Sequence, residues 1–380
     1  MFIINEKIVF KKFLTENSYF FLLTSLSMAF IVWVIRAVNN LDIVVEDGHS
    51  FLIYFYYTAL IYPKIFGQIL PLIFFTSLFY TLSKYEDNNE LKIIWINGIN
   101  KIEFFNSILK YTVAFFIIQI LIVAFLGPHL QNKARNYIKD STIDFFPSLF
   151  QEKKFIDTVD KLTIFIESKN SKNEFSNIYL KDESNKLPRI IVAKKGKLII
   201  EGNNRILRLI DGKFININKL GNSTSFNFEK TNFNLSKYLT KTTTHTKLQE
   251  INILELLTCI NYILIKKKTY DNNGLNCSND SISEIMSEVY SRIFKPLFLF
   301  LLSSVVIFLL VSNHENKKFR KLKLIIFFLG VLAIVISETM VVYSGKSNLN
   351  MLISIFFPLI IFLILYIIFY KTVGYKNTKI

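Results

Sequence analysis

Few residues in the sequence have the type and spacing that enzyme chemistry requires. The tripeptide GKS at 345–347 ends a phosphate-binding loop in many nucleotide hydrolases, but such a loop also needs a glycine five positions before Gly345, where Met340 stands. The four histidines are far apart in the sequence: His49, His129, His245 and His314. They form no HExxH pair and no cluster with cysteine, and no GxSxG nucleophile motif occurs. We therefore predict no catalytic residue, no metal site and no cofactor bound by this chain.

The two cysteines, Cys259 and Cys277, are compatible with two interpretations. Their spacing matches no CxxC motif and no metal-binding pattern. A disulfide between them requires an oxidising compartment. We favour two unpaired thiols, and the sequence leaves the pairing open.

The composition points to a membrane protein. Of the 380 residues, 51% are hydrophobic and only 19% are charged, and the mean hydropathy is +0.36, which is too apolar for an ordinary soluble protein. The formal net charge of +16 suggests nucleic-acid binding at first, but the lysines and arginines mostly flank apolar runs instead of gathering with aromatic residues. That pattern is typical of membrane topology signals, so we predict no nucleic-acid partner.

Six apolar stretches are long enough to cross a bilayer, which takes roughly 20 residues. They are Ser18–Ile35, Ile65–Leu82, Phe104–Gly127, Ile293–Val311, Leu322–Tyr343 and Leu349–Tyr370. The aromatic-rich stretch SFLIYFYYTALIYPK precedes the second of them. We expect it to form a separate interfacial helix that ends at Pro63, before the span begins.

Lysine and arginine in the short connecting segments predict the orientation of the chain, because cytoplasmic loops are enriched in both. Basic residues precede the first span, separate the second from the third and the fourth from the fifth, and follow the sixth: Lys7, Lys11, Lys12, Lys84, Lys92, Lys101, Lys317, Lys318, Arg320, Lys321, Lys323, Lys371, Lys376 and Lys379. The segment NNLDIVVEDGHS between the first two spans has acidic residues and neither lysine nor arginine. We therefore expect both termini and Lys84–Phe105 in the cytoplasm, and Pro128–Arg292 outside.

The segment between the third and fourth spans is predicted to be a β-rich domain. Its apolar runs are short, and alternation as in TIFIES and FININ is typical of antiparallel strands with one buried face. The sequences KGK, around Gly196, and DGK, around Gly212, are expected to form tight hairpin turns. We expect about five to eight strands in a sandwich or jelly roll. A helix over Leu248–Lys266 and a helical lead-in over Ser281–Tyr290 follow.

These observations predict an α-helical membrane protein with six transmembrane helices, three before and three after an inserted all-β, jelly-roll-like domain. The expected parts are a membrane half over 1–128, the β-rich domain with its helical connector over 129–290, and a second membrane half over 291–380. The inserted domain is either a rigid spacer or docking module, or a trough that shields an acyl chain from water. The sequence favours neither.

The stretch KYEDNNELKIIWINGINKIEFF between the second and third spans is predicted to contain a short amphipathic helix, over about 87–98. Asp87 to Asn89 can cap its start, and Gly98 can end it.

One face of this short helix carries three apolar side chains at helical spacing: Leu91, Ile94 and Trp95. Two interpretations stay open. Either the helix lies on the inner leaflet, for which a tryptophan is suited, or its apolar face fills a groove on a partner protein. In the second case Glu90 would pair with an arginine of the partner, because a charge-assisted pair is strongly directional.

The layout of the chain resembles the lipopolysaccharide-export permeases of the LptF/LptG family. In that family the second span is followed by Asn/Ser-Glu-Leu, a short helix and a glycine, which correspond here to Asn89-Glu90-Leu91 and Gly98. Asn97 departs from the family pattern, which often has a small or basic residue before that glycine.

Three further stretches carry the resemblance. IVAKKGKLII followed by RLIDGKF resembles strands of the family's periplasmic jelly roll. The acidic residue, arginine and proline at the family's entry to the fourth span correspond to Glu288, Arg292 and Pro296. VVEDGHSFLIYFYYTALIYP is closer to LptF than to LptG.

The resemblance implies a permease subunit in the bacterial inner membrane, with a periplasmic β-domain and both termini cytoplasmic. Such a subunit extracts lipopolysaccharide from the outer leaflet and passes it to a periplasmic bridge. The implied partners are a homologous, LptG-like permease, a dimeric LptB-like ATPase that binds ATP and Mg, and an LptC/LptA-like bridge protein. The resemblance also assigns coupling to the ATPase to five residues of the short helix: Glu90, Leu91, Ile94, Trp95 and Gly98.

Two other functions remain as alternatives. One is a membrane sensor whose β-domain binds an external ligand, although the chain has only loops where a cytoplasmic effector domain would stand. The other is a permease of the lipoprotein-release type, which usually has four spans and longer cytoplasmic arms.

Four basic residues lie at the predicted outer membrane edge: Arg36, Lys64, Arg292 and Lys295. Snorkelling to ordinary lipid headgroups accounts for each one singly. Because the resembling family carries a phosphorylated lipid, binding to its headgroup is the expected role of the four together, and of Arg36 and Lys295 above all. Glu338 lies inside the fifth span, where an acidic residue is costly, so we expect it to pair with a base or to act as a gate.

Overall fold

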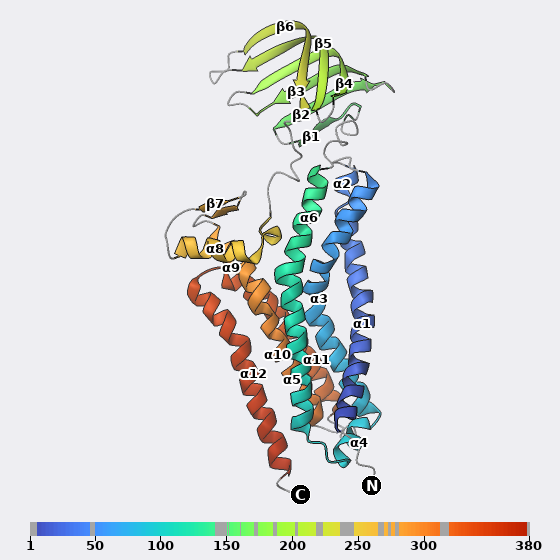
Figure 1. Cartoon of the computed structure of the whole chain (residues 1–380), viewed down its shortest axis with the longest axis vertical. Coiled ribbons are helices and arrows are strands. Elements are labelled where there is room, and N and C mark those ends of the chain that lie inside the picture. Colours follow the sequence, from blue (N-terminus) through green and yellow to red (C-terminus); the bar gives the residue numbers. More distant parts are fainter. Residues whose placement is uncertain are drawn as a thin grey trace. The chain divides into compact units, whose positions relative to one another are not determined.

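The computed structural model describes most of the chain. The described residues are 6–45, 50–140, 150, 152–159, 161–170, 174–184, 188–201, 204–217, 223–235, 247–264, 270–272, 275–277, 281–311 and 319–377. Three of the lysines that predict the topology, Lys317, Lys318 and Lys379, lie outside these residues. The chain divides into two compact units (Figure 1). The helical unit comprises Met1–Trp33, Tyr62–Leu130 and Leu248–Ile380, and the second unit comprises Val34–Ile61 and Gln131–Lys247.

Six helical segments of the described residues are long and apolar enough to cross a membrane, which confirms the predicted number of spans. They are Ile8–Val44, Phe51–Asp87, Lys101–Lys139, Ile282–Val311, Phe319–Ser344 and Asn348–Val373. The helices that build them are α1 (Glu6–Asn39) with α2 (Asp42–Val45), α3 (Phe51–Asp87), α5 (Lys101–Ile120) with α6 (Gly127–Asp140), α9 (Ile282–Val289) with α10 (Phe298–Ile307), α11 (Phe319–Ser344) and α12 (Asn348–Asn377). The third and fourth segments also contain turns that are wider or tighter than those of an α-helix. These are η1 (Leu121–Leu126), η4 (Tyr290–Phe294), η5 (Lys295–Leu297) and η6 (Phe308–Val311).

Proline does not end the helices where the sequence suggests an end. α3 runs without a break through Pro63, so the prediction of a separate interfacial helix before the second span is wrong. Membrane helices tolerate proline because neighbouring helices, nearby side chains and local adjustments of the helix satisfy the backbone groups that the proline leaves unbonded. The third span continues past its predicted end at Gly127, through Pro128 to Asp140. The Gly127 N–H donates to the carbonyl of Ile122, and this wider, π-type turn makes room for the proline ring.

α10 forms the centre of the helical unit. Every residue of α10 except Phe300 is buried, and α5, α11 and α12 surround it. α11 also approaches α3 closely at Gly330, where an added Cβ would lie 2.0 Å from the ring of Phe75. By contrast, α1, α11 and α12 leave many large apolar side chains exposed. Apolar surfaces of that extent are suited to lipid or to other apolar protein surfaces, and not to water.

The second unit contains an antiparallel sheet of six strands, which confirms the predicted all-β insert. The strands are β1 (Phe155–Val159), β2 (Leu162–Lys169), β3 (Glu174–Asp182), β4 (Arg189–Glu201), β5 (Asn204–Ile217) and β6 (Ser223–Asn234). Each strand pairs with the next in the sequence, so the sheet is a meander. The described strands do not include the Greek-key connection of a jelly roll. A buried apolar cluster lies on one face of the sheet and includes Ile164, Leu180 and Leu209.

The two predicted glycine turns are wrong, because both glycines lie inside long strands. Gly196 is in the middle of β4, opposite Leu209 of β5, and Gly212 is opposite Ala193 of β4. A Cβ at Gly212 would lie 2.4 Å from the Val192 carbonyl oxygen. Glycine is therefore required here because a neighbouring strand approaches closely, and not because the chain turns.

The chain enters the fourth span through a small, disulfide-linked group of elements. After η3 (Leu248–Glu250) come α8 (Ile253–Leu264), the paired strands β7 (Tyr270–Asn272) and β8 (Leu275–Cys277), and then α9. The predicted helices over 248–266 and 281–290 are present with narrower bounds, and the strand pair lies between them. Cys259 and Cys277 form a disulfide, so the preference for unpaired thiols is wrong. α8 and β8 bury both cysteines in one apolar cluster, a proximity that sequence spacing does not reveal.

Candidate functional site

The helix α4 (Glu90–Ile96), between α3 and α5, begins and ends at residues with positive φ. Asn89, just before it, has a φ of 60° and makes no side-chain capping bond, contrary to the expectation. Instead, the Asn88 side-chain amide donates to the Glu90 carboxylate at 3.2 Å. Gly98 has a φ of 89°, and its N–H donates to the Trp95 carbonyl, so a glycine ends the helix as predicted.

The predicted apolar face of α4 packs on the chain itself. Leu91 has no exposed surface, and Ile94 retains 7%. Both belong to the core of the helical unit, so they are not available to a groove on another protein. The side of α4 that remains open carries two other apolar residues, Ile93 and Ile96, whose exposed fractions are 54% and 72%.

A row of aromatic rings connects α4 to three membrane helices. Trp95 of α4 meets the ring of Phe104 on α5 edge-on, with 5.6 Å between the ring centroids. Phe104 lies 4.9 Å from Phe13 of α1, and Phe13 lies 5.3 Å from Tyr85 of α3. Because interiors of this kind are close-packed, a displacement of α4 must displace the ends of α1, α3 and α5 as well.

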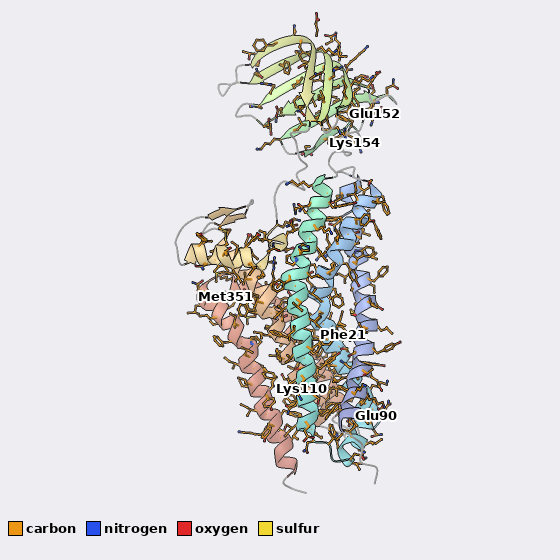
Figure 2. The ribbon with its side chains drawn as sticks, in the orientation of Figure 1. Phe21, Glu90, Lys110, Glu152, Lys154 and Met351 are labelled. Atoms are coloured by element: carbon orange, nitrogen blue, oxygen red, sulfur yellow. A yellow bond between two sulfur atoms is a disulfide. The ribbon has the colours of Figure 1, made fainter. Side chains whose placement is uncertain are left out.

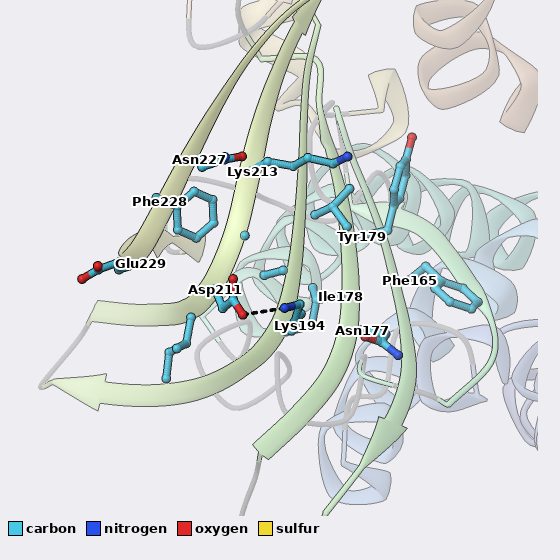
Figure 3. Close-up of a pocket in the computed structure, with 14 residues that line it drawn as sticks. Phe165, Asn177, Ile178, Tyr179, Lys194, Asp211, Lys213, Asn227, Phe228 and Glu229 are labelled. Atoms are coloured by element: carbon cyan, nitrogen blue, oxygen red, sulfur yellow. Dashed lines mark ion pairs between the residues drawn. The ribbon is translucent and has the colours of Figure 1, made fainter.

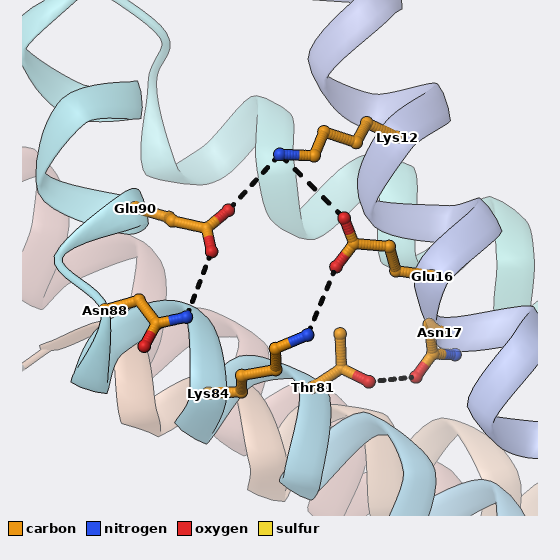
Figure 4. A network of polar contacts seen from close by, with 7 residues as sticks. All are labelled: Lys12, Glu16, Asn17, Thr81, Lys84, Asn88 and Glu90. Carbon is orange, nitrogen blue, oxygen red and sulfur yellow. Dashed lines mark hydrogen bonds and ion pairs between the residues drawn. The ribbon is translucent and has the colours of Figure 1, made fainter.

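Charged side chains form a second link between α4 and α1 (Figure 4). Lys12 of α1 lies 3.5 Å from the Glu90 carboxylate and 3.8 Å from that of Glu16. Glu16 in turn lies 3.8 Å from Lys84 of α3. Exposed pairs of this kind contribute only about 0–1 kcal/mol each. Glu90 is therefore held in place but can exchange Lys12 for a stronger partner at little cost.

Arg292 is a fully buried anchor at the opposite end of the helical unit. It lies in the π-turn η4 and pairs with Glu288 at 2.8 Å. The same guanidinium donates to the carbonyls of Ile251 at 2.6 Å and Leu248 at 2.9 Å. Of the four basic residues with a predicted headgroup role, Arg292 is thus used inside the protein, where it ties η3 to the fourth span.

Lys64 binds the same turn from another helix. It lies on α3 and donates to the side-chain oxygen of Gln249. The structure therefore brings Lys64 and Arg292 together around Leu248–Glu250, the turn through which the chain returns to the helical unit.

Lys295 and Glu338 form an ion pair between the fourth and fifth spans. The Lys295 ammonium is nearly buried and lies 2.6 Å from the Glu338 carboxylate, whose side chain is 60% exposed. This is the kind of pairing that an acidic residue within a span requires. Arg36 differs from the other three bases, because it lies in the last turn of α1 and is exposed.

The family model for the lipopolysaccharide export system permease LptF/LptG matches residues 12–372. The chain belongs to this family. The match does not distinguish LptF from LptG. The chain is also 24% identical, over 377 residues, to a protein of Rickettsia prowazekii (strain Madrid E) described as uncharacterized protein RP871. That alignment covers 96% of this chain and 100% of the relative.

Membership of the LptF/LptG family, together with the six apolar helices, makes the chain a multi-pass membrane protein of a transporter permease family. The sequence resemblance that rests on Asn89-Glu90-Leu91 and on Glu288, Arg292 and Pro296 is thereby confirmed at the level of the family.

The β-sheet of this LptF/LptG family member carries a cavity of about 860 Å³ (Figure 3). Phe165, Tyr179 and Phe228 give its wall an apolar part. Lys194 and Asp211, which form an ion pair at 2.8 Å, give it a charged part. The hydrogen bond from Lys194 to Asp211 raises the pKa of Lys194.

Several residues that connect α4 to the spans are not recognisable as such from the sequence. Lys12 and Glu16 are four residues apart, a spacing that signals a pair on one helix. No local signal links Lys12 to Glu90 or Phe13 to Phe104, because those contacts join segments about 80 to 90 residues apart and arise only from the fold.

Proposed function

We propose that this chain is the permease subunit of an ATP-driven lipopolysaccharide exporter in the bacterial inner membrane. The family match over nearly the whole chain carries the proposal. The chain takes lipopolysaccharide from the outer leaflet and passes it to a periplasmic bridge protein. It works with a homologous second permease, and a dimeric cytoplasmic ATPase binds ATP and Mg and supplies the energy.

The proposed orientation has α4 in the cytoplasm and α8 on the periplasmic side, with both termini cytoplasmic. Glu90 of α4 and Met351, near the start of α12, lie at opposite ends of the helical unit (Figure 2). The bases of the short loops support the cytoplasmic assignment of the α4 end. The disulfide at the α8 end supports an oxidising compartment there.

In the proposed coupling mechanism, α4 has an inner and an outer face with different roles. Leu91, Ile94 and Trp95 hold α4 against the spans, and Gly98 ends the helix, so a push on α4 is passed on to α1, α3 and α5. Glu90 and the exposed Ile96 form the face that the ATPase contacts. An arginine of the ATPase replaces Lys12 as the partner of Glu90, since a bidentate arginine–carboxylate pair is stronger than an exposed lysine pair.

In the proposed cargo path, the four basic residues have different roles. Arg36 is exposed and contacts the phosphorylated headgroup. Lys64 and Arg292 hold the turn Leu248–Glu250 in place next to the path, because their polar contacts are within the protein. Lys295 binds the headgroup when its pair with Glu338 opens, and Glu338 acts as the gate that competes with the phosphate.

Two other candidates are less favoured. A lipoprotein-release-type permease usually has four spans, and this chain has six candidate spans within its described residues. A membrane sensor needs a cytoplasmic effector, and the predicted cytoplasmic loop over Lys84–Phe105 is short.

Co-purification of the full-length chain from its native membrane tests the proposal. We expect a stable complex with a nucleotide-binding subunit and a second six-span permease, and glycolipid in the preparation. Recovery with a histidine kinase or another signalling effector, and without any nucleotide-binding subunit, would contradict it.

A further inference from the structure

α8 is an apolar helix that is too short to cross a bilayer. Its 12 residues span about 18 Å, whereas the hydrocarbon core of a membrane is about 30 Å thick. One face of α8 is buried in a small apolar cluster that contains Leu256, Cys259 and Ile263 of α8 with Ile285 and Val289 of α9. This cluster accounts for only one side of the helix.

The opposite side of α8 presents large apolar residues. Leu254 is 68% exposed and Leu257 is 41% exposed. They are three residues apart, so they project from the same face, and the exposed Thr258 and Asn261 continue that face. A helix with one face in a protein core and leucines on the other needs a second apolar environment.

The place of α8 in the helical unit indicates what that environment is. α8 runs crosswise to α10, α11 and α12, at the end of the unit where α11 ends and α12 begins (Figure 1). Met351, in the first turn of α12, packs against the same cluster as α8. Leu349 and Leu352 of that turn are themselves exposed, so the apolar surface of α12 begins beside α8. A helix at the ends of the spans and across them lies in the plane of a membrane surface.

Two features of this region bear on how α8 meets a membrane. One fixes which face of α8 is exposed, and the other favours an anionic leaflet. Cys259, on the buried face, is bonded to Cys277 of β8, so α8 cannot roll Leu254 and Leu257 inward. In the sequence, three consecutive lysines at 266–268 follow the end of α8. Basic residues that follow an apolar interfacial helix in the sequence add to its attraction to anionic headgroups.

We propose that α8 is an interfacial helix whose Leu254 and Leu257 lie at the boundary between headgroups and acyl chains of an anionic leaflet. The helix thereby fixes the depth of the fourth span and of η3 in the bilayer. The inference rests on the membrane assignment of the chain and not on its cargo, so it can fail while the export function stands.

Depth-dependent quenching in vesicles tests the inference. The full-length chain, with Trp33 and Trp95 replaced by phenylalanine, receives one tryptophan as Leu254→Trp or Leu257→Trp. The vesicles contain phosphatidylethanolamine and phosphatidylglycerol, with lipids brominated either near the headgroup or near the chain end. Phe328→Trp on the exposed face of α11 is the control within the bilayer, and Phe226→Trp on the exposed strand β6 is the control for water.

We expect both α8 tryptophans to be quenched about twofold more by the shallow bromines than by the deep ones. Replacing phosphatidylglycerol with phosphatidylcholine, or the lysines at 266–268 with glutamine, should make this quenching weaker. Quenching no greater than that of Phe226→Trp, in protein whose disulfide is intact, would overturn the inference. So would quenching that disappears when the second permease is added, because the face would then be covered by protein.

Discussion

Lys12 on the first membrane helix lies 3.5 Å from the carboxylate of Glu90 at the start of α4. These residues are 78 positions apart in the sequence, and the pair joins α4 to a span that α4 does not follow directly. A row of ring contacts, which runs from Trp95 through Phe104 and Phe13 to Tyr85, connects the same elements. α4 is therefore packed against the spans and is not attached through its loop alone. A force applied to α4 therefore reaches three helices at once.

The two faces of α4 should respond differently to mutation. Leu91→Ala removes a fully buried side chain and should lower the free energy of unfolding by about 2–5 kcal/mol. Ile96→Ser, on the exposed face, should leave stability within about 0.5 kcal/mol of the parent but weaken ATPase binding. Thermal unfolding in detergent and a pull-down with the ATPase measure the two effects. Equal loss of stability in both variants would contradict the assignment of the faces.

The pair between Lys295 and Glu338 should be strongly coupled. Glu338→Gln leaves a nearly buried ammonium without its carboxylate, at a cost of about 1–3 kcal/mol. The double variant Lys295→Met with Glu338→Gln should recover part of that loss, because the unpaired charge is gone. A double-mutant cycle on thermal unfolding measures the coupling, and strictly additive effects would show that the pair contributes nothing.

The disulfide should be required for the stability of the elements between η3 and α9. The double variant Cys259→Ala, Cys277→Ala lacks the disulfide that closes a loop of 18 residues. Its free energy of unfolding should be lower by about 3 kcal/mol. We expect easier proteolysis near residues 265–280 while the spans remain folded. Non-reducing electrophoresis of the parent protein should show a mobility shift on reduction. An absence of any shift would mean that the thiols are unpaired in the cell.

Gly330 should accept no larger residue. Its Cα faces the ring of Phe75, and Gly330→Val places a branched side chain where the ring already lies. We expect poor membrane accumulation of this variant, since overpacking typically costs about 1–3 kcal/mol and no space is free at this contact. Phe75→Ala combined with Gly330→Val should restore accumulation in part. Wild-type levels of the single variant would show that α3 and α11 do not touch there.

The sequence predicts the layout well because long apolar runs and lysine-flanked loops are local signals. The six spans, the inserted sheet, the end of α4 at Gly98 and the family are all confirmed by structure or comparison. The errors have a common cause. Proline and glycine usually interrupt helices and strands, but here Pro63 lies inside a continuous helix, and Gly196 and Gly212 lie inside strands whose neighbours approach them closely.

Roles of single residues were harder to predict than elements. Leu91 and Ile94 have the spacing of an amphipathic helix, but spacing alone does not say which protein covers the apolar face. Arg292 has the position of a headgroup ligand, yet its donors are used by Glu288 and two backbone carbonyls. In both cases the deciding partners come from distant parts of the sequence, so no local pattern could reveal them.

The most direct test of the account is ATP-dependent transfer of lipopolysaccharide from vesicles that contain this chain, its second permease and the ATPase to a soluble bridge protein, measured by photo-crosslinking. The matched variants are Glu90→Ala and Lys12→Ala, which remove either side of one pair. We predict that Lys12→Ala transfers at nearly the parental rate, because the exposed pair is worth about 0–1 kcal/mol, and that Glu90→Ala stays in the membrane but transfers nothing. Parental transfer and ATPase association in Glu90→Ala would contradict coupling through α4.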